Sequence, residues 1–588
     1  MDSENETAVL EEAVTGEFML DGTVDLNGNP VHWSRTVIFF FVCKNLCASV
    51  TLLVINSTSL YGKQVDVKNE KLSRVLIVYE VFERVAFFGV STNLVVYLTK
   101  KLHQGTVASA NNVTNWSGVA LMAPLLGAYF ADEHFGRYWC FSISSAINIV
   151  GMCLLTLSVS IPRLKPYPCR KALESLALGS GGTKSNISSF GAQRFDEFEP
   201  KEKKHKLSFN WWVFCVFIGN LLANTFLVYI QDNVSWALGY GIPTMGLAIS
   251  TLIFLVGTPH YRHKVPIGNH FTAMVRVIVA SLRKWGVSLP DDLQELYEID
   301  VEYKCEKGKN RMKSTPSLRF LDKAAVRVGE DTRWMLCSVT QVEETKQVLR
   351  MIPILAAIFV PSTMVAQANT LFVKQGTILD KHIGSFEIPP ASLHVFLTIL
   401  ILISIAIYDC FFVKVMKKWT RNPRGITLLQ RMGVGLVLHV VVMVIASITE
   451  SKRLRFTKHH GVVENGEVPL TIFVLVPQFI LMGMADAVLE GGKMEFFYDQ
   501  APESMKSWGA SLFPISLGMG SFLSSIILST VSNITKKHCR EGWILDNLNA
   551  SHLDYYYAFL AMLSFLNLMF FIVVARIYVY KVQIPDMI

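Results

Sequence analysis

Long apolar stretches separated by short polar ones run along almost the whole chain. Most have the length of an α-helix that crosses the hydrocarbon core of a bilayer, about 20 residues. The pattern predicts twelve such helices, at about residues 36–56, 74–99, 116–131, 138–160, 210–231, 236–257, 351–373, 391–413, 429–449, 470–489, 506–532 and 555–580. We therefore expect an all-α membrane protein.

The polar stretch at 258–348 divides these helices into two halves, as in many transporters. The predicted organisation is an N-terminal tail, a helix bundle, a linker, a second bundle and a C-terminal tail. Their ranges are 1–73, 74–257, 258–348, 349–580 and 581–588.

Basic loops indicate which ends of the helices face the cytoplasm. Residues 414–425 hold five Lys/Arg and no acid, and parity places the 258–348 linker on the same side. One predicted helix separates 414–425 from the basic residues at 451–460, so these are expected on the opposite, non-cytoplasmic side.

Composition excludes several functional classes. Of the 588 residues, 51% are hydrophobic and 17% charged, against roughly 25% charged in soluble domains. The formal net charge of +8 is small for a membrane protein with basic loops, so nucleic-acid binding is not implied. The ten cysteines form no CxxC pair, and no enzyme motif is present, so we expect neither a metal site nor an enzyme.

The segment 74–99 places Glu80, Glu83 and Arg84 within two turns, on one face of a helix. A charge at the centre of a bilayer costs about 2.5–3.5 kcal/mol, so these groups must pair or face water. Two carboxylates beside one arginine favour a proton relay along a substrate path. The alternative is a purely structural ion pair.

A second set of charges interrupts the segment 470–489 and the residues that follow it. Asp486 lies deepest and is a candidate substrate or gating group, with a helix-packing hydrogen bond as the alternative. Glu495 and Asp499 approach the cytoplasmic end and are expected at the interface. His439 is expected to be a hydrogen-bonded packing residue.

Two further groups are candidates from their local sequence. Lys184 follows a glycine run, but Thr183 stands where a phosphate-binding loop needs glycine, so a nucleotide site is not expected. A lysine there suits an anionic substrate or a carboxylate across the pore, or it is a loop-end lysine. The turn after the third segment is a candidate gating element, through Gly127, Asp132, Gly136 and Arg137.

Together these residues resemble the proton-dependent oligopeptide transporter family, in its plant nitrate and peptide branch, within the major facilitator superfamily. The resemblance covers about residues 74–580. It rests on the order of EVFERVAFFG, LHQGTVASANNVTNW, LLGAYFADEHFGR, GSGGTKSNISSFGAQRFDEF and FFYDQAPESMKS, with the long linker between halves.

The resemblance implies two six-helix bundles that alternate access to the two sides, driven by protons as co-substrate and without another cofactor. It assigns proton coupling to Glu80, Glu83 and Arg84, and substrate binding to Arg84, Lys184 and Asp486.

The chain departs from the family pattern at several places. Phe87 and Phe88 replace two tyrosines and become candidate substrate contacts in a more apolar cavity. Val365 stands where nitrate-transporting relatives can carry histidine. The fourth helix looks shortened between Pro168 and Gly179, and 36–73 looks like an apolar insertion.

The predicted function is proton-coupled symport of a small nitrogenous solute, with di- and tripeptides favoured. Alternatives are nitrate, a larger organic solute such as a hormone or glucoside, or a non-transporting sensor or defective paralogue. The expected partners are that solute and the lipid bilayer of the plasma membrane or vacuole. The number of subunits stays open.

Overall fold

Helices dominate the computed structural model. It describes residues 67–131, 136–161, 173–180, 183, 216–256, 258, 270–290, 296–297, 315–328, 334–420, 424–461, 467–502, 506–538 and 542–580. The predicted apolar segment at 36–56 lies outside these residues.

The first half of the chain supplies one group of helices. They are α4 (Val67–Ser91), α5 (Leu94–Lys100), α6 (Thr106–Phe130), α7 (Gly136–Ser160), η6 (Ala223–Leu227), η7 (Ile230–Val234) and α11 (Trp236–Val256), with further helical residues at 173–180, 216–222 and 228–229.

The second half supplies the remaining helices and four short strands. The helices are α12 (His270–Arg283), η10 (Arg319–Ala325), α14 (Val339–Ala357), α15 (Phe359–Ala368), α16 (Leu371–Gly376), η11 (Pro390–Leu393), α17 (His394–Ile407), η12 (Tyr408–Phe412), α18 (Val413–Thr420), α19 (Leu428–His459), η13 (Ile472–Leu475), α20 (Val476–Gln500), α21 (Lys506–His538) and α22 (Leu553–Ile577). Strand β1 (Leu379–Asp380) pairs with the parallel strand β4 (Val468–Thr471), and β2 (His382–Ile383) with the antiparallel strand β3 (Phe386–Glu387).

Eight helical segments in the described part of the chain are long and apolar enough to cross a membrane. A ninth crossing results if α14 and the helices after it, bent by 46°, form one span. These nine coincide with nine of the twelve predicted segments. Helix α6 covers the predicted 116–131 segment but is less apolar, since Asn111 and Asn115 interrupt it. The 210–231 segment is described only from residue 216.

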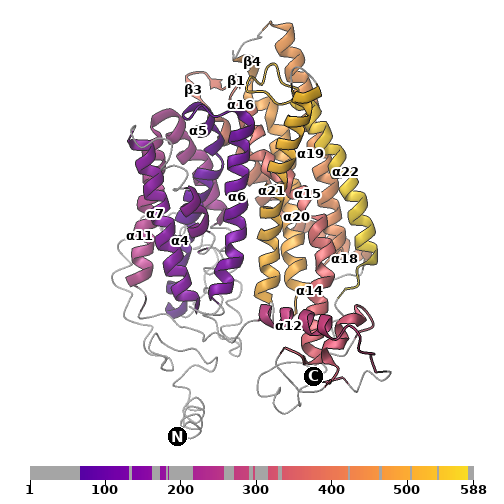
Figure 1. Cartoon of the computed structure of the whole chain (residues 1–588). Helices are drawn as coiled ribbons and strands as arrows, with labels where there is room; N and C mark the ends of the chain where they lie inside the picture. Colours follow the sequence, from indigo (N-terminus) through magenta and orange to yellow (C-terminus); the bar gives the residue numbers. More distant parts are fainter. Residues whose placement is uncertain are drawn as a thin grey trace.

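The helices form two groups that lie side by side (Figure 1). Aromatic rings fill the core of the first, where Phe141 of α7 contacts Tyr79 of α4 and Phe254 of α11. In the second, Phe372 of α16 contacts Phe479 of α20 and Tyr557 of α22. The outer faces expose large apolar side chains, as expected where helices meet lipid.

The two groups meet along α6 and α21. A side chain on Gly118 of α6 would collide with Phe522 of α21, because its Cβ would lie 2.9 Å from the ring. Asn111 of α6 donates a hydrogen bond to Ser529 of α21 at 2.8 Å. A second contact joins Asn220 to Thr398 of α17 at 3.1 Å. We call these two lines of contact the seam.

The described linker residues pack against the end of the second group. Helix α14 begins at Val339, inside the range predicted for the linker, because Ser338 and Gln341 form a capping box. Lys346 on α14 is fully buried and lies 2.8 Å from both Asp322 and Glu343. This ion-pair network fixes η10 to α14.

The ends of the helices agree with the predicted sides. Helices α12 and α18, from the linker and the basic 414–425 stretch, lie at one end of the molecule (Figure 1). Strands β1, β3 and β4 lie at the other, which we call the outer end. Helix α19 has 32 residues, about 48 Å at 1.5 Å per residue, so its basic C-terminal part extends beyond the hydrocarbon core.

We predict that Gly520→Ala destabilises the second group of helices. An added Cβ would lie 2.3 Å from Cβ of Ser362 and 2.9 Å from the carbonyl oxygen of Phe359, so α21 must move away from α15. Overpacking of this kind costs about 1–3 kcal/mol. Thermal unfolding of the purified protein measures it, with Gly433→Ala as control, whose Cβ would meet only Phe571 at 3.7 Å. Equal unfolding temperatures in both variants would contradict the close packing.

Candidate functional site

The three charged residues of α4 form one hydrogen-bonded cluster, as the spacing predicts. Arg84 lies 2.6 Å from Glu80 through Nη2, and its Nε donates to the same carboxylate at 2.7 Å. The Arg84 Nε atom lies 3.5 Å from Glu83 Oε2. The two glutamate side chains are 1% and 2% exposed, whereas Arg84 is 14% exposed. Arg84 is therefore the member of the cluster with the most exposed surface.

A residue from the helical stretch 173–180 completes this cluster. Ser180 ends the helical residues 173–180, and its hydroxyl donates to Glu83 Oε1 at 2.7 Å. Those residues pack tightly on α7, since a Cβ on Gly179 would lie 2.4 Å from the backbone nitrogen of Asn148. Helix–helix approach at glycine thus brings Ser180 to Glu83.

The candidate substrate contacts Phe87 and Phe88 belong to an aromatic group inside the first bundle. Phe87 is 8% exposed and stacks on Trp116 of α6, with ring centroids 5.4 Å apart. Phe88 meets the edge of Phe87 at 5.5 Å. Trp116 in turn donates to the carbonyl of Leu173 at 2.9 Å. These rings link α4 and α6 to the helical residues 173–180.

Helix α20 of the second bundle holds an ion pair between two of its own residues. Lys493 Nζ lies 2.6 Å from Glu490 Oε1 and donates to the Ser362 hydroxyl of α15 at 3.1 Å. Lys493 is fully buried, whereas the Glu490 side chain is 19% exposed. Glu490, rather than Lys493, is therefore the member of this pair that solvent or a solute can reach.

Asp486 lies beside His439 of α19, with Oδ1 3.2 Å from Nε2. The Nδ1 atom of His439 lies 2.9 Å from the Gly435 carbonyl oxygen. The expectation that His439 is hydrogen-bonded and buried fits this contact. Its ring also faces Asp486, the acid of α20 predicted to be functional, and the sequence did not reveal this contact.

The interfacial acids pair at the cytoplasmic end. Arg424 lies 3.0 Å from Asp499 and 3.4 Å from Glu495, and Arg431 lies 3.4 Å from Glu495. The hydrogen bond to Asp499 raises the pKa of Arg424. These contacts join α19 and α20, consistent with the predicted interfacial role.

The predicted gating residues lie where α6 turns into α7. The Gly127 carbonyl accepts a hydrogen bond from Cys140 Sγ at 3.2 Å, and Gly136 begins α7 with φ of +71°. Such a φ favours glycine because other residues meet a steric penalty there. Arg137 is half-buried beside it. Asp132 and Lys184 lie outside the described residues, so their predicted contacts stay predictions.

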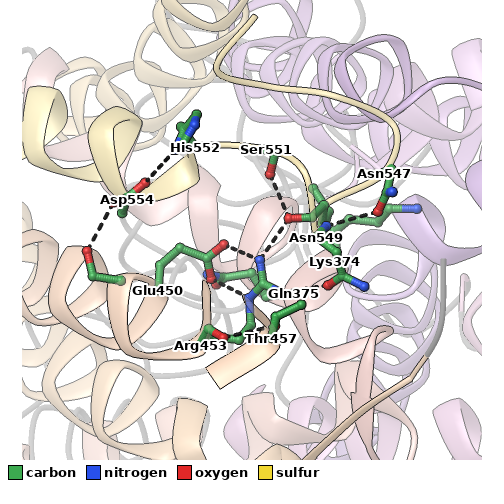
Figure 2. Close-up of polar contacts among 12 residues, drawn as sticks. Lys374, Gln375, Glu450, Arg453, Thr457, Asn547, Asn549, Ser551, His552 and Asp554 are labelled. Atoms are coloured by element: carbon green, nitrogen blue, oxygen red, sulfur yellow. Dashed lines mark hydrogen bonds and ion pairs between the residues drawn. The ribbon is translucent and has the colours of Figure 1, made fainter. Parts of the chain in front are cut away.

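A cluster that the sequence did not reveal lies at the outer end of the second bundle (Figure 2). Arg453 and Glu450 of α19 are fully buried and 2.6 Å apart. Arg453 also donates to the Asn549 side chain at 2.9 Å and to the Leu548 carbonyl at 2.8 Å, and Gln375 donates to Glu450 at 2.7 Å. The pair thus joins α19 to α16 and to residues 542–552.

A cavity of about 940 Å³ lies at the outer end, apart from the α4 cluster. Its lining includes Lys100, Asp232 and Trp236 of the first bundle and Glu387 and Pro390 of the second. Burial raises the pKa of Asp232, although its contact with Asn93 opposes this. We assign the candidate site to the charges inside the spans, because burial in a membrane must be offset by function or pairing.

The comparisons with known proteins identify the family. The POT family model matches residues 138–544, which is more than half of the chain. The chain belongs to the POT family. It is 53% identical over 599 residues to Protein NRT1/PTR family 5.2 of Arabidopsis thaliana, covering 98% of this chain and 97% of that protein. Protein NRT1/PTR family 5.1 of the same plant is 45% identical, covering 96% and 94%.

Solved structures show the same fold. An auto-inhibited POT family peptide transporter matches with a TM-score of 0.66 at 18% identity, covering 88% of this chain and 98% of that one. The POT family transporter PepTSo gives 0.66 at 20% identity, covering 86% and 98%. The predicted major facilitator fold is confirmed. The POT family member described here is a multi-pass membrane transporter of small molecules and not an enzyme.

We predict that Arg453→Met destabilises this POT family member strongly. The change leaves the Glu450 carboxylate buried without its 2.6 Å partner, and breaking a buried pair from one side costs about 3–5 kcal/mol. The double variant Glu450→Gln, Arg453→Met removes both charges and is expected to recover much of this loss. Thermal unfolding measures both, and a double variant no more stable than the single one would contradict the argument.

Proposed function

We propose that the protein is a proton-coupled symporter of a small nitrogenous solute, most favourably a di- or tripeptide. The observation that carries the proposal is the α4 cluster, in which two carboxylates and one guanidinium share a hydrogen-bonded network inside a membrane span. Such groups are rare in spans and typically serve proton or solute pathways.

The geometry assigns different roles to the two glutamates. Glu80 makes both short contacts with Arg84, whereas Glu83 lies 3.5 Å from it and shares its other oxygen with Ser180. Glu83 is therefore the proposed proton carrier. Its protonation removes one attraction on Arg84, whose guanidinium can then bind the carboxylate of a solute.

The second bundle offers the complementary charge. A peptide carries an ammonium group as well as a carboxylate, and the partly exposed Glu490 beside Asp486 is suited to attract it. The predicted pairing of Lys184 with Asp486 at the inner gate remains part of the proposal. Solute and proton would then bias the same equilibrium between two conformations.

Nitrate is the second candidate solute, because relatives carry nitrate and peptide transporter family names. Val365 of α15 weighs against the histidine-based nitrate site that the family resemblance implies. The apolar pair Phe87 and Phe88 leaves a larger organic solute open. A non-transporting sensor is the remaining alternative.

Uptake of a labelled dipeptide at about pH 5.5 and about pH 8 tests the proposal, because uptake that consumes protons as co-substrate depends on the proton concentration. Wild-type uptake should be at least about fivefold higher at the acidic pH, and Glu83→Gln should abolish this dependence. Glu83→Asp, which keeps the carboxylate, is the matched control and should retain a pH dependence.

Three outcomes count against parts of this scheme. Uptake that ignores pH in both wild type and Glu83→Gln contradicts proton coupling. Competition by nitrate but not by dipeptides favours the second candidate solute. A stably folded protein that transports neither supports the sensor alternative.

A further inference from the structure

The first bundle contacts residues 542–552 of the second bundle at the outer end of the seam. The Asp546 carboxylate accepts a hydrogen bond from the backbone N–H of Thr106 at 2.6 Å. Thr106 is the first residue of α6, and the helix N-terminus carries a partial positive charge that favours an anion. Gly105 permits the approach, because a Cβ there would lie 2.9 Å from Asp546 Oδ1.

We propose that Asp546 is a latch that holds the outer end closed by capping α6 across the seam, and that Arg453 sets its position. The proposal rests on the alternating access described under Proposed function.

Charges near Asp546 favour the same role. Lys374 of α16 is attracted to Asp546 and repelled by Lys100 of α5, which belongs to the other bundle. The carboxylate therefore offsets a repulsion between two lysines on opposite sides of the seam. Asp546 itself is exposed, so its contact is weak enough to break when the outer end opens.

The buried Glu450–Arg453 pair holds the two segments of the second bundle that carry Asp546 and Lys374 (Figure 2). Arg453 binds Leu548 and Asn549, which follow Asp546 closely in the chain. Glu450 accepts from Gln375, the neighbour of Lys374. A pair with no exposed surface thus positions an exposed acid that touches the opposite bundle.

Further contacts join the two bundles at the outer end. Asn233 donates to the Glu387 carbonyl at 3.1 Å, and Tyr229 stacks on Phe386 at 5.2 Å. Asp546 and the β3 contacts therefore hold the same end of the two bundles together.

Hydrogen–deuterium exchange of the purified full-length protein tests the latch without any solute. In Asp546→Ala, peptides covering 102–110 should exchange about fivefold faster, the factor that corresponds to about 1 kcal/mol. Peptides covering 229–234 and 383–389 should also exchange faster, because the whole outer end opens. Peptides covering 120–130, at the inner end of α6, should exchange more slowly.

Matched variants separate a latch from a local cap. Asp380→Asn removes another outer-end carboxylate, whose hydrogen bonds among the described residues run to nearby His382, and should match wild type. Asn549→Ala keeps the buried ion pair but removes one anchor of the loop, so it should reproduce part of the Asp546→Ala pattern. Faster exchange confined to 102–110, or none at all, overturns the proposal.

The exchange experiment and the uptake experiment test separate proposals. If Asp546→Ala gives the expected exchange pattern but uptake does not depend on pH, proton coupling is overturned and the latch is supported. If uptake is proton-coupled but faster exchange in Asp546→Ala is confined to residues 102–110, the latch is overturned and the proposed function is supported.

Discussion

A charge buried inside a membrane protein has to be compensated by a neighbouring group. This constraint applies to the buried charges of both helix bundles. In the first bundle Arg84 is held between two glutamates. In the second, Lys493 pairs with Glu490, His439 faces Asp486, and Arg453 pairs with Glu450. Each pair joins residues of one helix or of two neighbouring helices, so the charges also set how helices pack. A proton or a charged solute that binds to one of these groups would leave its partner less compensated.

The seam holds the contacts between the two bundles. Helices α6 and α21 approach closely at Gly118, where the Phe522 ring occupies the space that a side chain would need. Polar contacts gather at the outer end, where the hydrogen bond between Asp546 and α6 joins the bundles. A few weak contacts of this kind suit a protein whose two conformations must lie close in free energy.

The sequence predicted the family, the fold and the α4 cluster, because helix periodicity and charge spacing are local properties. Glu80, Glu83 and Arg84 share one face through spacings of three and four residues, and the structure brings them together. The sequence analysis did not predict that α14 begins at Val339, inside the predicted linker, where the capping box at Ser338 starts the helix.

Contacts between distant segments were beyond such reasoning. Nothing in the local pattern shows that Ser180 reaches Glu83, or that Asp486 meets His439. The basic residues at 451–460 were expected on the outer side, yet Arg453 among them is buried and donates to Leu548 and Asn549 of a distant segment. Charges spaced along one helix can be read from one segment, whereas a contact between distant segments needs both partners in space.

The most direct test of proton coupling follows the proton itself. Purified protein in liposomes that enclose a pH-sensitive dye is given a dipeptide under an imposed inside-negative voltage. The account predicts acidification of the interior that depends on the dipeptide and disappears when Glu83 is replaced by Gln. Dipeptide entry with no movement of protons would contradict it.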